Sequence, residues 1–316
     1  MGAGLFGYTV RRLLWCIPVL LTVSVIVFWI VRLAPGDPVD TLLGQRYDPA
    51  VADRLRHKYG YDQPIYQQYF TYMNNLFHGD LGVSTRHQDF TVKQVVLPKM
   101  WVSTQIGFYA MIITFMLGIP VGVYAALARG TFLDPLIIGS WLMLDAIPIF
   151  VLIPVAQWFF ALKLGIVGLG YDGVYSSHMI LPILLLGLPG VAGVARLMRA
   201  SVITVVGEDY VRTARAKGLK DETVIITHVA RNALLPMVSI IGLSLPGLVG
   251  GELFLEELFG IPGIGQESLQ AVLAPDFDVV LFLVLFSSTL FVLANVLFDL
   301  LYGVIDPRIR LGEARG

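Results

Sequence analysis

The sequence is poor in charged residues. Asp, Glu, Lys and Arg make up 14% of its 316 residues, while 56% are hydrophobic. An ordinary globular chain carries about 25% charged residues, so too little polar surface exists here to coat a soluble domain of this length. The composition therefore predicts a multi-spanning, all-α membrane protein. The net charge of −1 decides nothing further, and we expect the lipid bilayer, not a nucleic acid, as a partner.

Cysteine and the common catalytic motifs are also scarce. Cys16 is the only cysteine, which excludes an internal disulfide. H-E-x-x-H and a serine nucleophile elbow are absent, and “GLGYDG” (168–173) resembles an aspartyl protease signature without a second matching motif. The five histidines are scattered, with no pair at metal-ligand spacing within a span. These absences predict a protein that is not an enzyme and holds no metal.

The phosphate-binding motif G-x-x-x-x-G-K-[ST] is missing as well. Without its backbone cradle and its lysine the chain should bind no ATP, so we expect no cofactor on this chain. A secondary transporter that works without partner subunits is the alternative from another class of protein. That alternative predicts paired charges across several spans or an internal inverted repeat, and the sequence contains neither.

Long apolar runs are what the sequence has in abundance. A helix needs about 20 apolar residues to cross about 30 Å of hydrocarbon. Six segments meet this requirement: roughly 11–31, 101–128, 134–161, 179–200, 236–256 and 279–303. Prolines interrupt five of them, which predicts either simple kinks or breaks that line a path. The first run follows Arg11 and Arg12 as in a signal peptide, but it is too long and lacks a cleavage site, so we expect a retained membrane helix.

Lys and Arg set the expected orientation. With the amino terminus inside, the short inner segments carry most of these residues. The outer loop 257–278 then carries no Lys or Arg. Its charged residues are acids, among them Glu257, Glu267, Asp276 and Asp278. Because cytoplasmic loops are enriched in Lys and Arg, we expect both termini in the cytoplasm.

Residues 32–100 predict a small external helical subdomain. “APGDP” (34–38) ends the first membrane helix, because two prolines and a glycine cannot continue it. In “DPAVADRLRHKYG” (48–60), Asp48 caps a helix, Pro49 takes its first turn and Gly60 ends it. The aromatic segment “QPIYQQYFTYMNNLFHG” (63–79) predicts a further helix, which packs either on the membrane interface or on a partner.

A short basic helix is predicted between the fourth and fifth spans. In “GEDYVRTARAKG” (207–218), acids fill the first turn and Arg215 and Lys217 the last, as the helix dipole favours. Gly218 suits a left-handed stop after the last turn. “KDETVIITHVARNALLP” (220–236) then starts a returning helix, with Asp221 as its expected cap. We call residues 207–235 the elbow.

Two interpretations of the elbow fit the sequence. It is either a solvated loop that follows the positive-inside rule or a docking site for another protein. The capped helix, the small residues and the glycine turn together favour docking. Ala214 and Ala216 leave the helix thin, so that a partner can approach closely, and Tyr210 and Val211 supply an apolar anchor.

The elbow sequence “DYVRTARAKGLKDETVIITHVARNALLP” resembles the cytoplasmic EAA loop of ABC importer permeases, in the form carried by the dipeptide/oligopeptide/nickel family. “VRLAPGDPVD” (31–40), “GDLGVST” (79–85), “FGIPGIG” (259–265) and “DLLYGVIDPRIRLG” (299–312) resemble the first permease subunit of that family, so the resemblance covers nearly the whole chain. Two departures stand out. The general Glu-Ala-Ala pattern falls on Arg212-Thr213-Ala214, and Pro275 occupies a position where the family often has arginine.

The resemblance implies a fold, a mechanism and partners. The fold is a type I ABC importer permease with six transmembrane helices. The first helix of the elbow would be the coupling helix: Ala214 and Gly218 would permit close docking on a separate ATPase, and Arg212, Arg215 and Lys217 would pair with its acidic groups. Two such ATPases would bind ATP and Mg and tilt the membrane helices between inward-open and outward-open states. A second, related permease subunit and an extracytoplasmic substrate-binding protein complete the expected complex.

The resemblance also implies a location and a cargo. We expect a multi-pass protein of a bacterial cytoplasmic (inner) membrane that imports di- or oligopeptides by alternating access. Nickel chelates, glutathione and oligosaccharides are the alternative cargoes. The expected division of the chain is 1–31 for the tail and first helix, 32–100 for the external subdomain, 101–306 for a five-helix core with the coupling loop 201–235, and 307–316 for a cytoplasmic tail.

Several polar residues fall inside the predicted spans. An ionisable residue there is costly unless it faces a partner or a cavity. Asp145 either contacts a positively charged group of the substrate or hydrogen-bonds a neighbouring helix, and Glu252 either lies near the outer gate or is an interfacial acid. Gln157 predicts a helix–helix hydrogen bond. Asn295 and Asp299, four residues apart on one helix face, predict a structural role.

Overall fold

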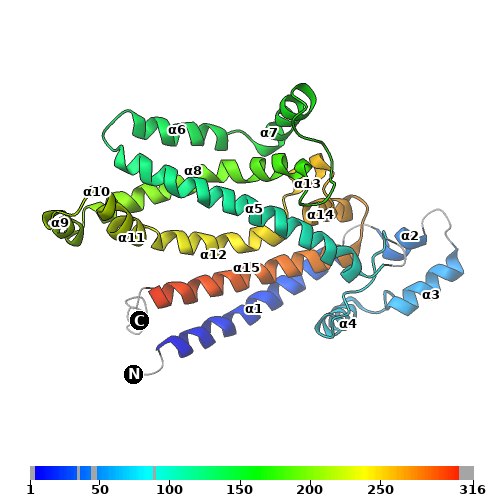
Figure 1. The fold of residues 1–316 in the computed structure, drawn as a ribbon. Helices are drawn as coiled ribbons and strands as arrows, with labels where there is room; N and C mark the ends of the chain where they lie inside the picture. The colour runs from blue at the N-terminus through cyan, green and yellow to red at the C-terminus, as the bar shows by residue number, and fades with distance from the viewer. Residues whose placement is uncertain (1–3, 34–35, 44–47, 88–89, 306–316) are drawn as a thin grey trace. The chain divides into compact units, whose positions relative to one another are not determined.

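The computed structural model describes residues 4–33, 36–43, 48–87 and 90–305. These residues are helical throughout, apart from turns and one isolated antiparallel bridge between Val83 and Thr91. The chain divides into two compact units (Figure 1). Unit 1 comprises residues 1–103, 249–253 and 262–316, and unit 2 comprises residues 104–248 and 254–261. The predicted all-α fold is therefore confirmed for the described residues.

Unit 1 is built on two long antiparallel helices. α1 (Gly4–Leu33) packs along α15 (Phe277–Ile305), and the first residues of α1 lie at the same end of the pair as the last residues of α15 (Figure 1). α1 ends at Leu33, where the sequence predicts its end, although Ala34 and Pro35 lie outside the described residues. The predicted tail 307–316 lies outside them as well.

The external subdomain sits at the other end of α1 (Figure 1). Its first long helix has the predicted ends: Asp48 accepts a hydrogen bond from Ala50 N at 2.9 Å, and Gly60 takes a φ of 69°. A side-chain acceptor and a left-handed glycine are the standard partners of unpaired helix ends. The helices of this end of unit 1 are α2 (Pro38–Leu43), α3 (Pro49–Tyr59), α4 (Ile65–Phe77) and α14 (Ile264–Leu273).

Unit 2 contains most of the remaining spans. Its helices are α5 (Val92–Leu127, from Thr104 onward), α6 (Leu133–Asp145), α7 (Ile149–Ala156), α8 (Ile180–Val206), α12 (Leu235–Gly250, to Leu248) and α13 (Leu253–Phe259, from Phe254). α5 and α8 approach closely, because a Cβ added to Gly122 would lie 2.5 Å from the backbone oxygen of Ala195. Thr114 Oγ1 also donates to the carbonyl of Gly187 at 2.7 Å. Small residues and hydroxyl bonds are the usual means of helix packing in membranes.

Five helices of the described chain are long and apolar enough to cross a membrane, and a bent pair is a possible sixth span. The pair joins α6 to the segment Ile149–Lys163 with a bend of 88°. Pro148 explains the break, since it lacks an N–H and disfavours α-helical geometry in the residue before it. The predicted span 134–161 is thus not one continuous helix.

The predicted outer boundary of the fifth span also needs correction. α12 ends at Gly250, and Gly251 then takes a φ of 70°. The predicted loop 257–278 is largely helical, because it holds the end of α13 and all of α14. Its acids are not uniformly solvated: Glu267 and Asp276 are fully buried, and Asp278 is 7% exposed.

Candidate functional site

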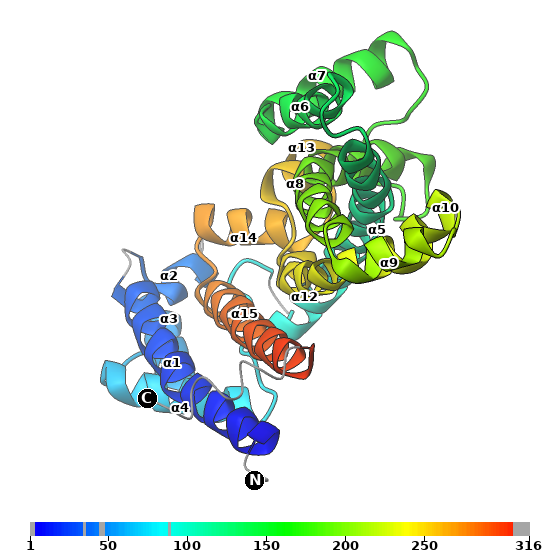
Figure 2. The same cartoon turned by 90° about the vertical axis from the view of Figure 1, so that its left-hand side faces the viewer.

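The elbow consists of a short helix, a turn at glycine and a returning segment. α9 (Asp209–Ala216) is followed by Gly218, which takes a φ of 78°. Glycine enters this left-handed region without steric cost. The returning segment comprises α10 (Asp221–Thr223), a π-helical stretch (Val224–Ala230) and α11 (Arg231–Ala233). Two helical segments joined at Gly218 are what the sequence predicts. The elbow lies at one end of α8 and α12 (Figure 1), and Figure 2 looks onto that end.

One face of α9 is buried within unit 2. Val211 is fully buried and Ala214 is 6% exposed. Both belong to an apolar cluster with α5, α8, the returning segment and α12, whose other members are Ala126, Val194, Met198, Val202, Val224, Val229, Ala233 and Met237. Burial of these side chains ties α9 to the membrane-spanning helices.

Two side-chain hydrogen bonds fasten the elbow further. Ser201 Oγ, on α8, donates to the carbonyl of Ala233 at 2.9 Å. Asn232 Nδ2 donates to the hydroxyl of Tyr210 at 2.9 Å, which links the returning segment to α9. Side-chain hydrogen bonds thus fix both α9 and the returning segment.

The outer face of α9 is charged and open. Arg212, Arg215 and Lys217 are exposed. Arg212 Nη1 lies 3.3 Å from Asp209 Oδ1, and Arg215 Nε lies 3.3 Å from Asp221 Oδ1. Exposed ion pairs of this kind contribute at most about 1 kcal/mol. Carboxylates of a partner can therefore compete for both guanidinium groups.

Three details of the elbow differ from the prediction. Val211 is expected, with Tyr210, as an apolar anchor for a partner, but it is fully buried within unit 2. Ala214 and Ala216 are both expected on the open face, but only Ala216 is exposed. Ala214 follows Val211 by three residues and so shares its buried face. Asp221 is expected as the cap of the returning segment, but Lys220 holds that position and makes no side-chain cap bond, while Asp221 pairs with Arg215.

Asp145 stands at the break of the bent pair. It is the last residue of α6, directly before the 88° bend, and its side chain is exposed on this chain. α6 has 13 residues, which gives a length of about 20 Å. Broken helices are tolerated at membrane depth where they line a cavity or another protein. Asp145 as a contact of the substrate path stays a prediction.

Glu252 lies between α12 and α13, after Gly251. Its side chain is half-buried, and this burial raises the pKa of its carboxyl above the ordinary value. The sequence predicts Glu252 inside the fifth span, but in the structure it follows the end of α12 at Gly250. Its part in an outer gate also stays a prediction.

The other polar residues of the spans have structural partners. Gln157 Nε2 donates to the carbonyl of Leu258 at 3.0 Å, which confirms a hydrogen bond between two helical segments. Asn295 Nδ2 donates to the carbonyl of Phe291, one turn earlier on α15. The side chain of Asp299 lies outside those described.

Sequence reasoning missed a polar network in unit 1. The buried carboxylate of Asp276 accepts hydrogen bonds from Ser84 Oγ, from Thr85 N at 3.2 Å and from Arg86 N at 3.3 Å. It closes the segment “GDLGVST” (79–85) onto “APDFD” (274–278). The sequence marks both segments, but they lie about 190 residues apart and no local pattern joins them.

A second buried acid lies near this network. Glu267 is fully buried and forms an ion pair with Lys99 Nζ. Arg86 Nη1 is 3.8 Å and His87 Nδ1 is 3.9 Å from its Oε1. A buried carboxylate requires such partners, because an unpaired charge is costly inside a protein.

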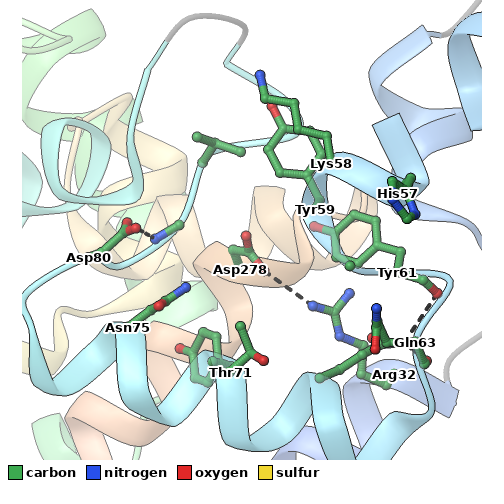
Figure 3. A pocket seen from close by; sticks show the side chains of 15 residues that line it. Arg32, His57, Lys58, Tyr59, Tyr61, Gln63, Thr71, Asn75, Asp80 and Asp278 are labelled. Atoms are coloured by element: carbon green, nitrogen blue, oxygen red, sulfur yellow. Dashed lines mark hydrogen bonds and ion pairs between the residues drawn. The ribbon is translucent and has the colours of Figure 1, made fainter. Parts of the chain in front are cut away.

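A third charged pair joins the two long helices of unit 1. Arg32 Nη2, in the last turn of α1, lies 3.6 Å from Asp278 Oδ1, in the first turn of α15, and both side chains are 10% exposed. The guanidinium of Arg32 also lies 4.6 Å from the ring centre of Tyr61. Arg32, Asp278 and Tyr61 line a polar cavity of about 550 Å³ (Figure 3).

Comparison with known proteins decides the family. Residues 118–311 match the family described as “Binding-protein-dependent transport system inner membrane component”. Residues 5–92 match the family described as “Binding-prot-dependent transport system membrane comp, N-term”. The first match covers more than half of the chain. The chain belongs to this family of ABC importer permeases.

Curated relatives support the same assignment over nearly the whole length of this permease. It is 38% identical to “Oligopeptide transport system permease protein OppB” of Salmonella typhimurium over 305 residues, which are 96% of this chain and 99% of the relative. It is 36% identical to OppB of Haemophilus influenzae over 95% of this chain and 98% of the relative. It is 36% identical to “Dipeptide transport system permease protein DppB” of Escherichia coli over 96% and 98%.

A solved structure supports the fold. The permease aligns with a chain of the MetNI methionine ABC transporter in an inward-facing conformation, with a TM-score of 0.55 and 18% sequence identity. The alignment covers 67% of this chain and 97% of the MetNI chain. The permease therefore has the type I ABC importer fold, as the sequence predicts. Its family and its long apolar helices place it in the inner membrane.

Proposed function

We propose that this permease forms one half of a peptide import path, and that separate ATPase subunits drive it through the elbow. The permease itself carries no catalytic site. ATP and Mg are bound by the ATPases, and the chain converts their closure into movement of its own helices.

The geometry of the elbow carries this proposal. α9 and the residue that caps its end present three exposed cations, Arg212, Arg215 and Lys217. α9 also buries Val211 and Ala214 against α8 and α12. A contact made on the outer face is thus passed to membrane-spanning helices through a packed interface. A solvated loop has no need of such a buried face.

The remaining partners follow from the family. A binding-protein-dependent system requires an extracytoplasmic binding protein, which we place over residues 32–100 and the outer loops. One permease with five helices and a bent pair supplies half of a path, and a related but different permease supplies the other half. Two ATPases then occupy the two elbows.

Peptides are the cargo that the comparisons support best, because relatives with 36% and 38% identity are dipeptide and oligopeptide permeases. Asp145 and Glu252 are the acids we propose for contact with a positively charged group such as a peptide amino terminus. Specificity resides mainly in the binding protein, so these acids act on passage and not on selection.

Uptake by the reconstituted complex tests the function. Proteoliposomes that contain the full complex and its binding protein should accumulate a labelled tripeptide only when ATP is supplied. Unlabelled di- and oligopeptides should compete. Competition by a nickel chelate, glutathione or an oligosaccharide, but not by peptides, would contradict the cargo alone. Equal uptake without ATP would contradict the drive through ATPases.

Cross-linking tests the docking. In a Cys16→Ser chain, a bifunctional reagent on Lys217→Cys should reach an ATPase subunit, with a yield that changes when ATP is added. Asp53→Cys is the matched control, because Asp53 is 79% exposed on the external subdomain. Its reagent should reach no ATPase. Docking on the elbow is refuted by the absence of any product from Lys217→Cys in every nucleotide state.

A further inference from the structure

The external subdomain contains one helix, α4, whose neighbours lie deep in the spans. Tyr69 of α4 shares a hydrogen bond of 2.7 Å with Ser24 of α1. The rings of Tyr69 and Tyr72 lie 5.4 and 5.9 Å from the ring of Phe28. Tyr72 also packs with Leu281 and Leu285 of α15. α4 therefore rests on two membrane-spanning helices at once.

The depth of these contacts follows from helix geometry. The apolar span of α1 runs over 24 residues from Val10 to Leu33, and Ser24 lies nine residues before its end. At 1.5 Å per residue, the span is about 36 Å long and Ser24 is about 14 Å from its end. The hydrocarbon core is about 30 Å thick. Even if the whole excess length lay at the Leu33 end, Ser24 would sit roughly 8 Å inside the hydrocarbon.

The polar level of unit 1 agrees with this depth. Arg32 and Asp278 pair at the ends of α1 and α15 and line the polar cavity shown in Figure 3. Ser24 lies eight residues before Arg32, or about 12 Å below it along the helix. The contacts of α4 with α1 are thus made below the level at which charged groups begin.

α4 also has an apolar flank that no described residue covers. Tyr66, Phe70 and Phe77 are 56%, 68% and 80% exposed. At 3.6 residues per turn they fall on one side of the helix. This side adjoins the buried face of Tyr69 and Tyr72. The apolar surface of α4 therefore extends well beyond the part that packs against α1 and α15.

The opposite side of α4 is polar. Thr71 and Asn75 are exposed and line the cavity beside Arg32 (Figure 3), while Gln67 and Asn74 lie between them and the aromatic flank. A helix with one polar side and one wide apolar side, aromatic at its edge, has the pattern of a helix that lies in the membrane interface. Aromatic side chains are enriched at that level of membrane proteins.

We propose that α4 is an interfacial helix immersed in the outer edge of the bilayer, with Tyr66, Phe70 and Phe77 in contact with lipid. The external subdomain is then not held above the membrane. It is anchored in it, with the cavity of Arg32 and Asp278 opening on the polar side of the same helix. The continuity of the flank with two membrane-spanning helices favours lipid over a protein as the occupant.

Spin labels measure this contact. In the Cys16→Ser chain, single cysteines replace Tyr66, Phe70 or Phe77, and Thr71 and Asn75 are the matched controls on the polar side of the same helix. All five positions are exposed, so a label should not disturb the fold. The labelled chain is assembled into the full complex, with cysteine-free partners, in phosphatidylcholine–phosphatidylglycerol liposomes. Power saturation then compares collisions with oxygen, which enters lipid, and with a water-soluble nickel chelate.

Labels at positions 66, 70 and 77 should collide with oxygen and resist the nickel chelate, while labels at 71 and 75 should show the reverse. Two results would overturn the proposal. Access of the chelate to all five positions places α4 in water. Protection of 66, 70 and 77 from both reagents places a protein on the flank. Neither outcome bears on peptide transport, so the proposed function stands or falls separately.

Discussion

Ala214 and Ala216 are two residues apart on α9 and face opposite environments. Successive positions turn by about 100° around an α-helix, so a separation of two places side chains on different faces. Ala214 packs in the apolar cluster with Val211, while Ala216 is exposed beside the cations. The same substitution at the two positions should therefore affect different properties: folding at Ala214 and docking at Ala216.

We expect Ala214→Asp to lower the amount of folded permease in the membrane, because a carboxylate in the apolar cluster costs several kcal/mol. Ala216→Asp should insert in normal amounts but lose at least about 90% of ATP-driven uptake, which corresponds to about 1.4 kcal/mol of coupling. Immunoblots of membranes and peptide uptake measure the two effects. Normal uptake by Ala216→Asp would contradict the docking of this face.

Residue chemistry was predictable where one residue acts alone. Asp48, Gly60 and Gly218 occupy the cap and turn positions that their side chains favour. The face of Ala214 was not predictable from composition, because the burial of α9 depends on helices that precede and follow it. The buried state of Glu267 and Asp276 was equally hidden, since their partners are far away in the sequence.

At the scale of elements, one ion pair joins the bent pair of helices to the core. Arg199 of α8 donates to both carboxylate oxygens of Asp134, in the first turn of α6, at 2.5 Å each. The Asp134 side chain is 10% exposed and that of Arg199 is 29% exposed. A two-bond pair of this kind fixes orientation as well as distance.

Removal of one residue of the Asp134–Arg199 pair should lower the stability of the permease more than removal of both. Asp134→Ala should destabilise the permease by about 2 kcal/mol, below the roughly 3–5 kcal/mol of a fully buried pair because Arg199 keeps some access to solvent. Asp134→Ala combined with Arg199→Met should recover part of that loss. Thermal unfolding of the purified complex in detergent compares the variants. A double variant no more stable than the single one would show that the pair does not hold α6 on α8.

Elements were predictable where length and hydropathy suffice. The long apolar runs became α1, α5, α8, α12 and α15. The sequence did not reveal that Pro148 bends its span by 88° where other prolines stay inside helices, because this choice depends on the neighbours that receive the freed backbone groups. α14 falls in the predicted loop 257–278, and α13 is divided between that loop and the predicted fifth span, since short helices leave little periodicity.

At the scale of the whole molecule, this permease is one subunit among several. The binding-protein-dependent transport family to which it belongs implies partner subunits. Native mass spectrometry of the extracted complex should find one copy of this chain, one of a related but different permease and two ATPase subunits. A lone monomer that transports without ATP would defeat this expectation.

The family was predictable from sequence because separate motifs along the chain fit one pattern in one order. The relation of the external subdomain to the membrane was not. It depends on the contact of Tyr69 with Ser24, which joins residues whose separation leaves no trace in any local pattern.

The π-helical stretch Val224–Ala230 gives the returning segment room for a change of length. It lies between the turn at Gly218 and α12. A π-turn holds about one residue more than an α-turn, so loss of one residue there can restore α-helical winding while the segments on either side keep their orientation. The returning segment can thus vary in length by one residue at this stretch without a change in the face that α9 presents.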